Sequence, residues 1–427
     1  MNMIIRLLLP LVLALPAGAV SLVSVNARGE AGNGFSRAPA ISADGRYIAF
    51  MSAASNLVEG DANGKADIFL RDRKEGTVTR ISMGMDGEEA DGDSSSPAIS
   101  ADGRVIAFLS QARNLVPEDT NKAADVFTYD RETGEMARAS VNSRRTQAAG
   151  ASGPPAISAD GRFVAFRSEA ENLVLNDSNG FADIFRHDRR EGVTIRVNVS
   201  SKGEEADGPS SGVPALSADG RYVAFVSNAA NLIPDDANGV TQDVFVRDVA
   251  AGTTTCISRP PGRATVTGES AGPSISADGR YVAFISFAES LVPGDANHAA
   301  DVFLHDRQQD TLTRITAGND ASLAVSLSAD GRALAYLSHA SDLAAGDANG
   351  YPDIFRYDVA TKTAVRVNVS AAGAEADDDS SAPAISGDCT VIAFVCWSSM
   401  LMPENKFSCG DVFVSELPDR GPAARPE

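Results

Sequence analysis

The stretch "ISADGRYIAF" (Ile41–Phe50) decides the fold, because close copies of it recur along the 427-residue chain. The later copies read "ISADGRVIAF", "ISADGRFVAF", "LSADGRYVAF", "ISADGRYVAF", "LSADGRALAY" and "ISGDCTVIAF". Their serines are spaced by 58 or 59 residues, with one interval of 52, and are Ser42, Ser100, Ser158, Ser217, Ser276, Ser328 and Ser386. A fixed period of this length indicates a repeat architecture, so we interpret the chain as seven copies of one unit.

Each unit reads as four short β-strands. An apolar strand ("PAIS") runs into the "ADGR" turn, where Asp and Gly favour a tight reversal. A second strand ("RYIAFMS") is apolar on both faces, and a loop leads from it to a third strand ("DIFLRD"). A turn with Gly76 precedes the fourth strand ("TVTRISM"). Four-stranded units at a constant period predict an all-β fold, a seven-bladed β-propeller with antiparallel blades.

The two ends of the chain predict how the ring closes. The last unit stops after its third strand, "DVFVSEL" (Asp411–Leu417), while "SLVSVNARGEAGNG" near the N-terminus matches a fourth strand and its following connection. We therefore expect Ser21–Asn26 to complete blade seven. The predicted organisation is a signal peptide over 1–19, a propeller over 20–417 with repeats beginning near 37, 95, 153, 212, 271, 323 and 381, and a disordered tail over 418–427.

The repeated "SADGRYVAFVS" and "DVFVRD" segments resemble the WD-repeat-like propeller repeats of the TolB type. In that family S-P-D-G-x-x-I-A-F is followed by D-I-Y or D-I-F. The resemblance covers nearly all of 20–417 and implies the propeller fold, whereas it implies little about function, because such repeats serve scaffolds, enzymes and peptidases. The sequence shows neither the N-terminal domain that TolB carries nor a peptidase domain, so we expect no literal TolB role.

The N-terminus and the composition predict an exported, acidic protein. Arg6, the apolar run 7–15 and the Ala17-Gly18-Ala19 site have the form of a secretory signal cut after Ala19. The apolar run is too short to span a bilayer, so we expect a periplasmic or secreted monomer that does not span a membrane. The formal net charge of −20 argues against nucleic acid as a partner, since that partner requires clustered Lys and Arg.

A second motif, D-x-N-G-x-x-D, recurs between the second and third strands and first appears in "GDANGKADIF" (Gly60–Phe69). Its six versions are Asp61/Asn63/Asp67, Asp119/Asn121/Asp125, Asp177/Asn179/Asp183, Asp236/Asn238/Asp243, Asp295/Asn297/Asp301 and Asp347/Asn349/Asp353. Calcium prefers hard oxygen ligands, which these residue types supply, so the loops are candidate structural calcium sites. In the alternative, Asp and Asn form Asx turns and cap the next strand without metal.

In blade seven this motif is missing and two cysteines, Cys396 and Cys409, bracket the loop. A Cys396–Cys409 disulfide would close the loop that Asp and Asn shape elsewhere. The alternative is a set of four unrelated thiols. Cys256, in a fourth strand, and Cys389, in a turn at the opposite end of the blade, are expected to be unpaired.

Catalysis needs an asymmetric constellation, and most polar residues here are repeated. No G-x-S-x-G, H-E-x-x-H or C-x-x-C motif appears, and His187 and His305 occupy a slot held by Arg in other units. The residues expected to line the channel are small: Ala40, Ala98, Ala156, Ala215, Ser274 and Ala384.

One asymmetric feature follows the second strand of blades five, six and seven, where Phe287, His339 and Trp397 stand. The connection between blades five and six is also the shortened one. The three side chains are a candidate ligand-binding platform, with unrelated drift at a variable loop position as the alternative.

These observations favour a non-enzymatic propeller of the TolB-like type. Its expected partner is a protein, peptide or glycan bound on the face that carries the repeated loops, with structural calcium as a candidate cofactor. The alternative is a hydrolase or lyase whose active site lies on the same face.

Overall fold

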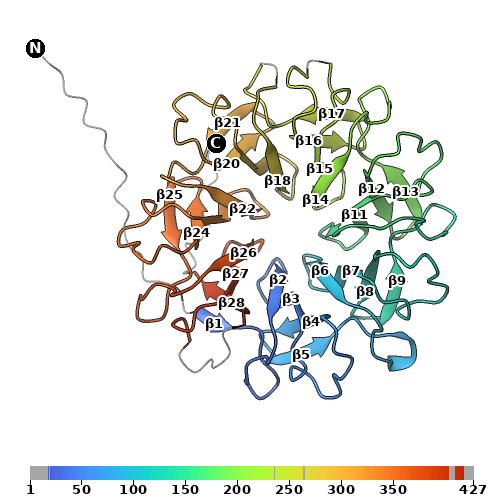
Figure 1. Cartoon of the computed structure of the whole chain (residues 1–427), viewed down its shortest axis with the longest axis vertical. Coiled ribbons are helices and arrows are strands. Elements are labelled where there is room, and N and C mark those ends of the chain that lie inside the picture. The colour runs from blue at the N-terminus through green and yellow to red at the C-terminus, as the bar shows by residue number, and fades with distance from the viewer. Residues whose placement is uncertain (1–17, 19, 235, 263–264, 403–408, 418–427) are drawn as a thin grey trace, which may run out of the picture.

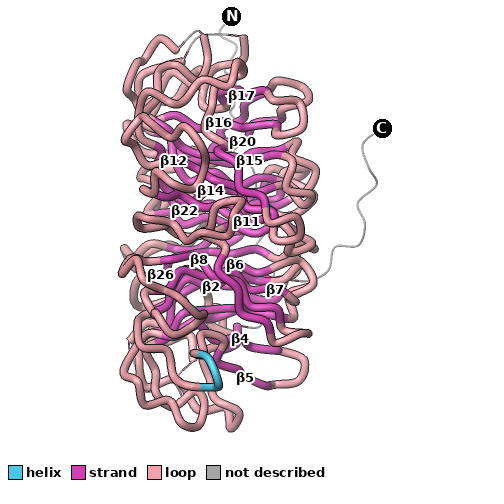
Figure 2. The backbone as a smooth tube through the Cα atoms, turned by 90° about the vertical axis from the view of Figure 1, so that its right-hand side faces the viewer, coloured by secondary structure: helices cyan, strands magenta, loops and turns pink. Residues whose placement is uncertain are grey.

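The computed structural model describes residue 18 and the ranges 20–234, 236–262, 265–402 and 409–417. It is a flat ring of seven four-stranded antiparallel sheets, seen down the channel in Figure 1 and from the side in Figure 2. The predicted seven-bladed propeller is therefore confirmed. The predicted signal peptide (1–19) and tail (418–427) fall almost entirely outside the described residues and stay predictions. Within the described ranges, no helix has the length and apolar character needed to cross a membrane.

In blades one to six the strands follow chain order from the channel outward. Blade one contains β2 (Ser36–Ile41), β3 (Tyr47–Ser52), β4 (Asp67–Asp72) and β5 (Thr77–Arg80), followed by a 3-10 turn, η1 (Met85–Gly87). Blade two contains β6 (Ser94–Ile99), β7 (Val105–Ser110), β8 (Asp125–Asp130) and β9 (Glu135–Arg138). Blade three contains β10 (Ala156–Ile157), β11 (Phe163–Ser168), β12 (Asp183–Asp188) and β13 (Val193–Arg196).

The remaining blades repeat this order. Blade four contains β14 (Ser210–Leu216), β15 (Tyr222–Ser227), β16 (Asp243–Asp248) and β17 (Thr253–Cys256). Blade five contains β18 (Ser270–Ile275), β19 (Tyr281–Ser286), β20 (Asp301–Asp306) and β21 (Thr311–Arg314). Blade six contains β22 (Ser322–Leu327), β23 (Ala333–Ser338), β24 (Asp353–Asp358) and β25 (Thr363–Arg366).

Blade seven joins the two ends of the chain. It contains β26 (Ser380–Ile385), β27 (Val391–Cys396) and β28 (Asp411–Glu416), and its outer strand is β1 (Val20–Leu22). The N-terminal segment therefore closes the ring as predicted, although the paired strand covers 20–22 rather than 21–26. Beyond Leu22 the contact continues through single bonds, because the Val23 N–H donates to the Val412 carbonyl at 2.8 Å.

The two middle strands of every blade supply the core. Phe50 on β3 lies opposite Phe69 on β4, with ring centroids 5.9 Å apart, and both side chains are fully buried. An aromatic pair of this kind recurs in all seven blades, with centroid distances of 5.5–6.1 Å. Burying a Phe side chain stabilises the fold by about 1.5–3 kcal/mol, so the repeated aromatic pair anchors each sheet.

The "SADGR" turns link neighbouring blades through a ring of backbone hydrogen bonds. The Ala43 N–H donates to the Ala101 carbonyl at 2.9 Å, and the same bond recurs from turn to turn as far as blade six. In blade seven the Asp388 N–H donates to the Ala43 carbonyl at 3.0 Å. Gly103, with φ +71°, lies against the neighbouring blade, where an added Cβ would meet the Tyr47 ring at 2.2 Å. Cys389 takes this glycine position in blade seven with φ +66°, and there the neighbouring residue is the small Ala333.

Because each blade is an antiparallel meander, its connections alternate between the two ends of the blade. We call the face with the strand two–three and blade-to-blade connections the loop face, and the opposite one the turn face. The channel wall is formed by repeated Pro-Ala-Ile segments, and the predicted small residues all line it, together with Ser326 of blade six. The lining residues are uncharged.

Candidate functional site

In the acidic loop of blade one, a buried arginine already meets the two carboxylates. Arg80 Nη1 lies 2.9 Å from an Asp61 oxygen and 3.6 Å from an Asp67 oxygen, and these three side chains are 6 %, 5 % and 0 % exposed. Asp67 also accepts the Ser82 hydroxyl at 2.5 Å and the Asn63 amide at 3.0 Å. Burial raises the pKa of both carboxyls, while the guanidinium opposes that rise.

The fourth strand provides the same arginine in four more blades. The shortest Arg–Asp distances there are 3.1 Å for Arg138–Asp119, 2.8 Å for Arg196–Asp183, 2.7 Å for Arg314–Asp301 and 2.7 Å for Arg366–Asp353. A calcium ion would have to sit beside this guanidinium, between the carboxylates that it contacts. These five loops therefore fit a cation poorly.

The asparagine of the motif forms an Asx turn. Asn63 Oδ1 accepts the Lys65 N–H at 2.9 Å, and Asn121, Asn179, Asn297 and Asn349 make the equivalent bond. The next residue is left-handed, with φ +65° at Gly64. The Asx-turn arrangement is therefore present in the structure at five of the six loops.

Blade four departs from this pattern. Cys256 stands where the other five blades with this loop have arginine, and Thr265 stands where blade one has Glu89. Among the described residues, no Lys or Arg forms an ion pair with Asp236 or Asp243, and burial raises the pKa of Asp243 to about 6. The Thr265 hydroxyl donates to Asp236 at 3.0 Å. Across the described ranges no group of three or more His, Cys, Asp and Glu forms a metal-binding cluster.

Asn238 of blade four does not form the Asx turn that the other five asparagines form. Nor does its side-chain oxygen face Asp243, as the predicted metal ligand would require. Its amide nitrogen donates to Asp243 at 2.9 Å and to the Val266 carbonyl at 2.8 Å. Its Oδ1 is buried and accepts no hydrogen bond from the described chain, so the Asx turn of the other loops is absent here. The loop has one extra residue before Asp243, which changes its course. Because the nitrogen faces the carboxylate, Asn238 would have to turn its amide over to offer an oxygen ligand beside Asp243.

The four cysteines are free thiols in this structure. Cys396 is 1 % exposed and accepts the Ser380 hydroxyl at 3.2 Å, in the slot where blade one has a Ser36–Ser52 pair. Residues 403–408, between Cys396 and Cys409, lie outside the described ranges. The predicted Cys396–Cys409 disulfide stays a prediction.

The predicted platform residues stand at equivalent positions on the rim of the channel. In every blade, the N–H of the residue after the second strand donates to a backbone carbonyl, which belongs to the residue before the first strand or, in blade three, to Ala151 before the isolated Ser152–Ser168 bridge. These rim pairs are Phe35–Ala53, Asp93–Gln111, Ala151–Glu169, Pro209–Asn228, Glu269–Phe287, Ala321–His339 and Asp379–Trp397. Phe287, His339 and Trp397 therefore lie side by side around the ring, one to a blade, rather than in one cluster.

The structure extends this arc into blade one. The Arg37 guanidinium lies 4.9 Å from the Phe35 ring centroid and 5.6 Å from that of Trp397. Phe287 is 57 % exposed, His339 is exposed and Trp397 is half-buried. The sequence prediction missed Phe35 and Arg37, although aligning the repeats one residue before the first strand reveals that Phe35 is the aromatic exception there.

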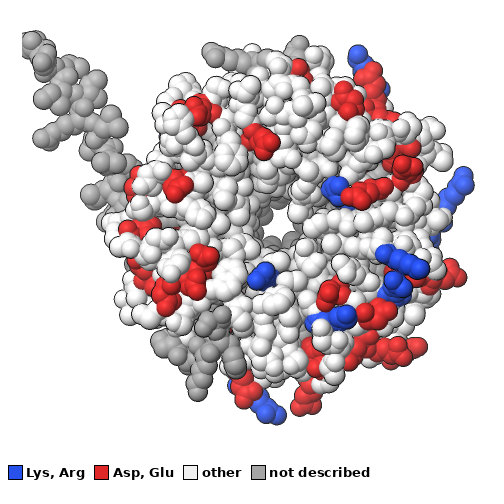
Figure 3. Space-filling model, in the orientation of Figure 1, with Lys and Arg blue, Asp and Glu red and all other residues white. Residues whose placement is uncertain are grey.

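Large exposed apolar side chains gather on the loop face. Seven of the nine in the described part of the chain lie in its connections, namely Met85, Leu175, Phe181, Val240, Phe287, Tyr351 and Met400. Val213 lies within the inner strand β14. The ninth, Val193, follows a turn on the opposite face. Figure 3 shows the loop face largely free of charged side chains around the channel opening. The two faces of the ring therefore differ in chemistry.

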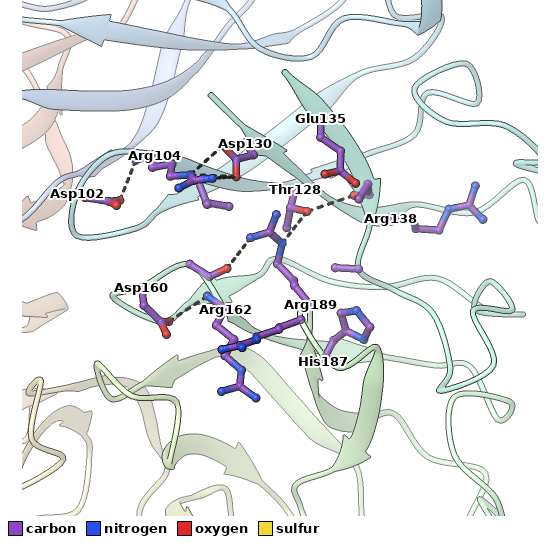
Figure 4. Close-up of a pocket in the computed structure, with 15 residues that line it drawn as sticks. Asp102, Arg104, Thr128, Asp130, Glu135, Arg138, Asp160, Arg162, His187 and Arg189 are labelled. Atoms are coloured by element: carbon purple, nitrogen blue, oxygen red, sulfur yellow. Dashed lines mark hydrogen bonds and ion pairs between the residues drawn. The ribbon is translucent and has the colours of Figure 1, made fainter. Parts of the chain in front are cut away.

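A groove of about 440 Å³ lies between blades two and three and is drawn in Figure 4. It lies where Val105 takes the position that is Tyr or Phe in blades one, three, four and five. Arg189 instead donates to the Thr128 hydroxyl at 3.2 Å and the Gly161 carbonyl at 2.7 Å. The groove is largely balanced in charge, since its arginines Arg104 and Arg162 pair with Asp130 and Asp188.

His187 in this groove is arranged as a structural residue. Burial lowers its pKa to about 4, so the ring is neutral. The Thr194 hydroxyl donates to the Val141 carbonyl, so His187 Nδ1, 2.9 Å away, donates to Thr194 rather than removing its proton. This geometry does not activate a nucleophile.

No protein-family model and no curated protein matches the chain. Among solved structures, an oligogalacturonate lyase in complex with manganese is 13% identical, with 95% of this chain and 99% of that chain covered and a TM-score of 0.57. The β-propeller domain of the Trilobed protease from Pyrococcus furiosus is 9% identical, with 90% and 94% covered and a TM-score of 0.55. TolB from Acinetobacter baumannii is 18% identical, with 71% and 64% covered and a TM-score of 0.39. The predicted propeller fold is confirmed, and the first two of these structures share it. Likeness at these identities extends to the fold and not to function.

Proposed function

We propose that this chain is an exported propeller that binds a polypeptide segment of another protein on its loop face. One observation carries the proposal, namely the concentration of exposed large apolar side chains on that face. Aromatic and methionine side chains are enriched at protein interfaces, and exposed aromatic residues supply much of the binding energy there. The signal-like sequence over 1–19 supports export.

A polypeptide suits this surface better than a glycan. Sugars stack on aromatic faces, but four of the seven exposed side chains are aliphatic or thioether groups: Met85, Leu175, Val240 and Met400. These groups are typical of protein interfaces. Enzymatic activity as a hydrolase or lyase stays an untested alternative, because structural likeness at 13% identity extends only to the fold.

A photo-cross-linking experiment tests the proposal. A photoreactive phenylalanine analogue is placed at Phe287 and, as a control, at Val193, which is exposed on the turn face. Extracts of the source organism should yield a covalent polypeptide adduct at position 287 and none at 193. The captured protein is then identified and purified for binding measurements. Equal capture at both positions, or binding only to glycans on an array, would contradict the proposal.

With that partner in hand, Phe287→Ala should weaken binding by about tenfold or more, because the ring is an exposed aromatic anchor. Its matched control is Gln111→Ala, which truncates the same rim position in blade two. The control should leave affinity unchanged. Isothermal titration of both variants measures the difference, and equal affinities would remove Phe287 from the binding surface.

We also propose that calcium, if this protein uses it, binds in blade four, because that acidic loop is the one without an arginine partner among the described residues. With weak extracellular-type affinity, about 10 mM calcium should raise apparent stability by about 1–3 kcal/mol relative to chelator. Asp236→Asn should abolish that gain, whereas Asp61→Asn in blade one should retain it. Thermal melting at matched ionic strength measures the effect, and an unchanged wild-type midpoint would argue against calcium.

A further inference from the structure

The loop face is not uniform in charge. In blades five to seven, the described segments 265–269, 287–300, 315–321, 339–352, 367–379 and 397–402 hold no Lys or Arg, while Arg259 lies earlier in the connection that leads into blade five. They carry exposed acids instead: Glu269, Glu289, Asp320, Asp342, Asp377 and Asp379. In Figure 3, red side chains lie over these blades, whereas the blue ones gather mainly over blades two to four. The half of the face with the predicted platform is therefore the acidic half.

The rim pairs place acids directly beside the aromatic side chains. The Phe287 N–H donates to the Glu269 carbonyl at 3.0 Å, and the Trp397 N–H donates to the Asp379 carbonyl at 3.0 Å. Cross-strand neighbours of this kind have side chains in reach of each other. Each pair therefore offers a ring face together with an exposed carboxylate, and the structure gives neither Glu269 nor Asp379 a cationic partner within its described residues.

A contact within the chain shows that these rim aromatic rings bind a guanidinium group. Arg37 is exposed, and its guanidinium lies over the rings of Phe35 and Trp397 at one end of the arc. Cation–π contacts of this geometry are attractive for Arg and Lys. At the other end, Phe287 is 57 % exposed and no cation covers it among the contacts of the described chain. That end is open to a cation from another molecule.

We propose that the partner segment is basic, and that its Lys or Arg side chains bind over blades five to seven, on the Phe287 ring and against Glu269 and Asp379. This inference rests on the proposed polypeptide binding and specifies its partner class. The acidic surroundings repel an acidic segment and raise the encounter rate of a basic one. The exposed ring adds contact area that charge attraction alone does not provide.

The chain offers a built-in probe, because Trp397 is its single tryptophan. Three synthetic peptides of equal length are titrated while its fluorescence is recorded. In them, Ser and Gly alternate with Lys, with Glu or with Gln. The Lys peptide should bind at least about tenfold more tightly than the Gln peptide, and its affinity should fall as salt is raised. The Glu peptide should show no binding.

Charge-neutralising variants locate the contact. Glu269→Gln combined with Asp379→Asn should reduce affinity for the Lys peptide by about tenfold. The matched control, Asp93→Asn, removes the rim acid of blade two and should change nothing. If the Gln or Glu peptide binds as well as the Lys peptide, the basic-partner inference is wrong and polypeptide binding stands. If no peptide binds and position 287 captures no polypeptide, both proposals are overturned.

Discussion

Gly103→Ala should lower the free energy of unfolding by about 3–4 kcal/mol, whereas Gly60→Ala should lower it by about 1 kcal/mol. Both glycines are left-handed, with φ of +71° and +77°. They differ in their surroundings, because an alanine Cβ at 103 would lie 2.2 Å from the Tyr47 ring, and at 60 it would meet nothing within 4 Å. Both substitutions therefore carry the cost of a left-handed alanine, and only Gly103→Ala adds a steric clash.

The Tyr47 ring cannot easily move away from the added Cβ of Ala at position 103. It is 8 % exposed, and the Arg131 guanidinium lies 4.0 Å from its centroid on the interface between blades one and two. Denaturant unfolding of both variants measures the difference. In a Tyr47→Ala background, Gly103→Ala should cost only about 1 kcal/mol, since the clash is removed. A cost that is the same in both backgrounds would show that Tyr47 is not the obstacle.

The interface between blades six and seven contains the natural counterpart of that double variant. There Cys389 of blade seven holds the glycine position and Ala333 of blade six holds the tyrosine position. Each departure looks arbitrary by itself in the sequence, and the sequence analysis left Cys389 as an unpaired thiol. The pairing lies between residues of neighbouring blades, 56 positions apart, and becomes visible only when the turn of one blade is placed against the strand of the next.

The repeats were sufficient to predict the fold because every unit contains the same sequence signals. Six "SADGR" turns and their "SGDCT" counterpart, seven aromatic pairs and one unmatched terminal strand all indicate the same ring. The exact closing strand was less certain from sequence, since the similarity to Ile195 and the residues after it does not show where pairing ends. In the structure the ladder stops at Leu22.

The acidic loops show where sequence reasoning fell short. The D-x-N-G-x-x-D motif attracted a metal interpretation because its carboxylates are close together in the chain. Their counter-charge, Arg80, lies 13 positions after Asp67 on another strand, so the motif alone omits it. The signal was nevertheless present, because arginine recurs at this position in five of the six units that carry the motif. Correlating the two positions across repeats would have predicted the ion pair.

Arg196→Met should lower the free energy of unfolding by about 3–5 kcal/mol at neutral pH, since it leaves buried carboxylates without their cation. Arg196 is 9 % exposed and contacts Asp177 at 3.1 Å, Asp183 at 2.8 Å and Glu205 as well. The guanidinium thus serves three acids at once. Methionine retains the apolar stem, so the loss is chiefly electrostatic. Denaturant unfolding measures it.

The loss of stability caused by Arg196→Met should be smaller at acidic pH. Burial and the neighbouring Asp183 raise the pKa of Asp177 to about 6 even with Arg196 present. A carboxyl whose pKa is raised by folding binds its proton more readily in the folded state, so its contribution to stability grows as pH falls through about 6. Without Arg196 this pKa rises further, and the variant should recover about 1–2 kcal/mol relative to wild type between about pH 7.5 and 5.

The variant and the wild type are compared at each pH, because this cancels the effect of His187 on stability, which has the opposite pH dependence. The pKa of His187 is lowered to about 4, so its unfolded form takes up a proton first, and both proteins lose stability below about pH 6.5 for that reason.

Blade four suggests a second test of the charge explanation. It has Cys256 and Thr265 in place of the arginine and the glutamate. Arg196→Met with Glu205→Thr reproduces that pairing and should regain about 1–2 kcal/mol at neutral pH, because one unpaired carboxylate is gone. If the double variant is no more stable than Arg196→Met, the loss comes from packing and not from charge.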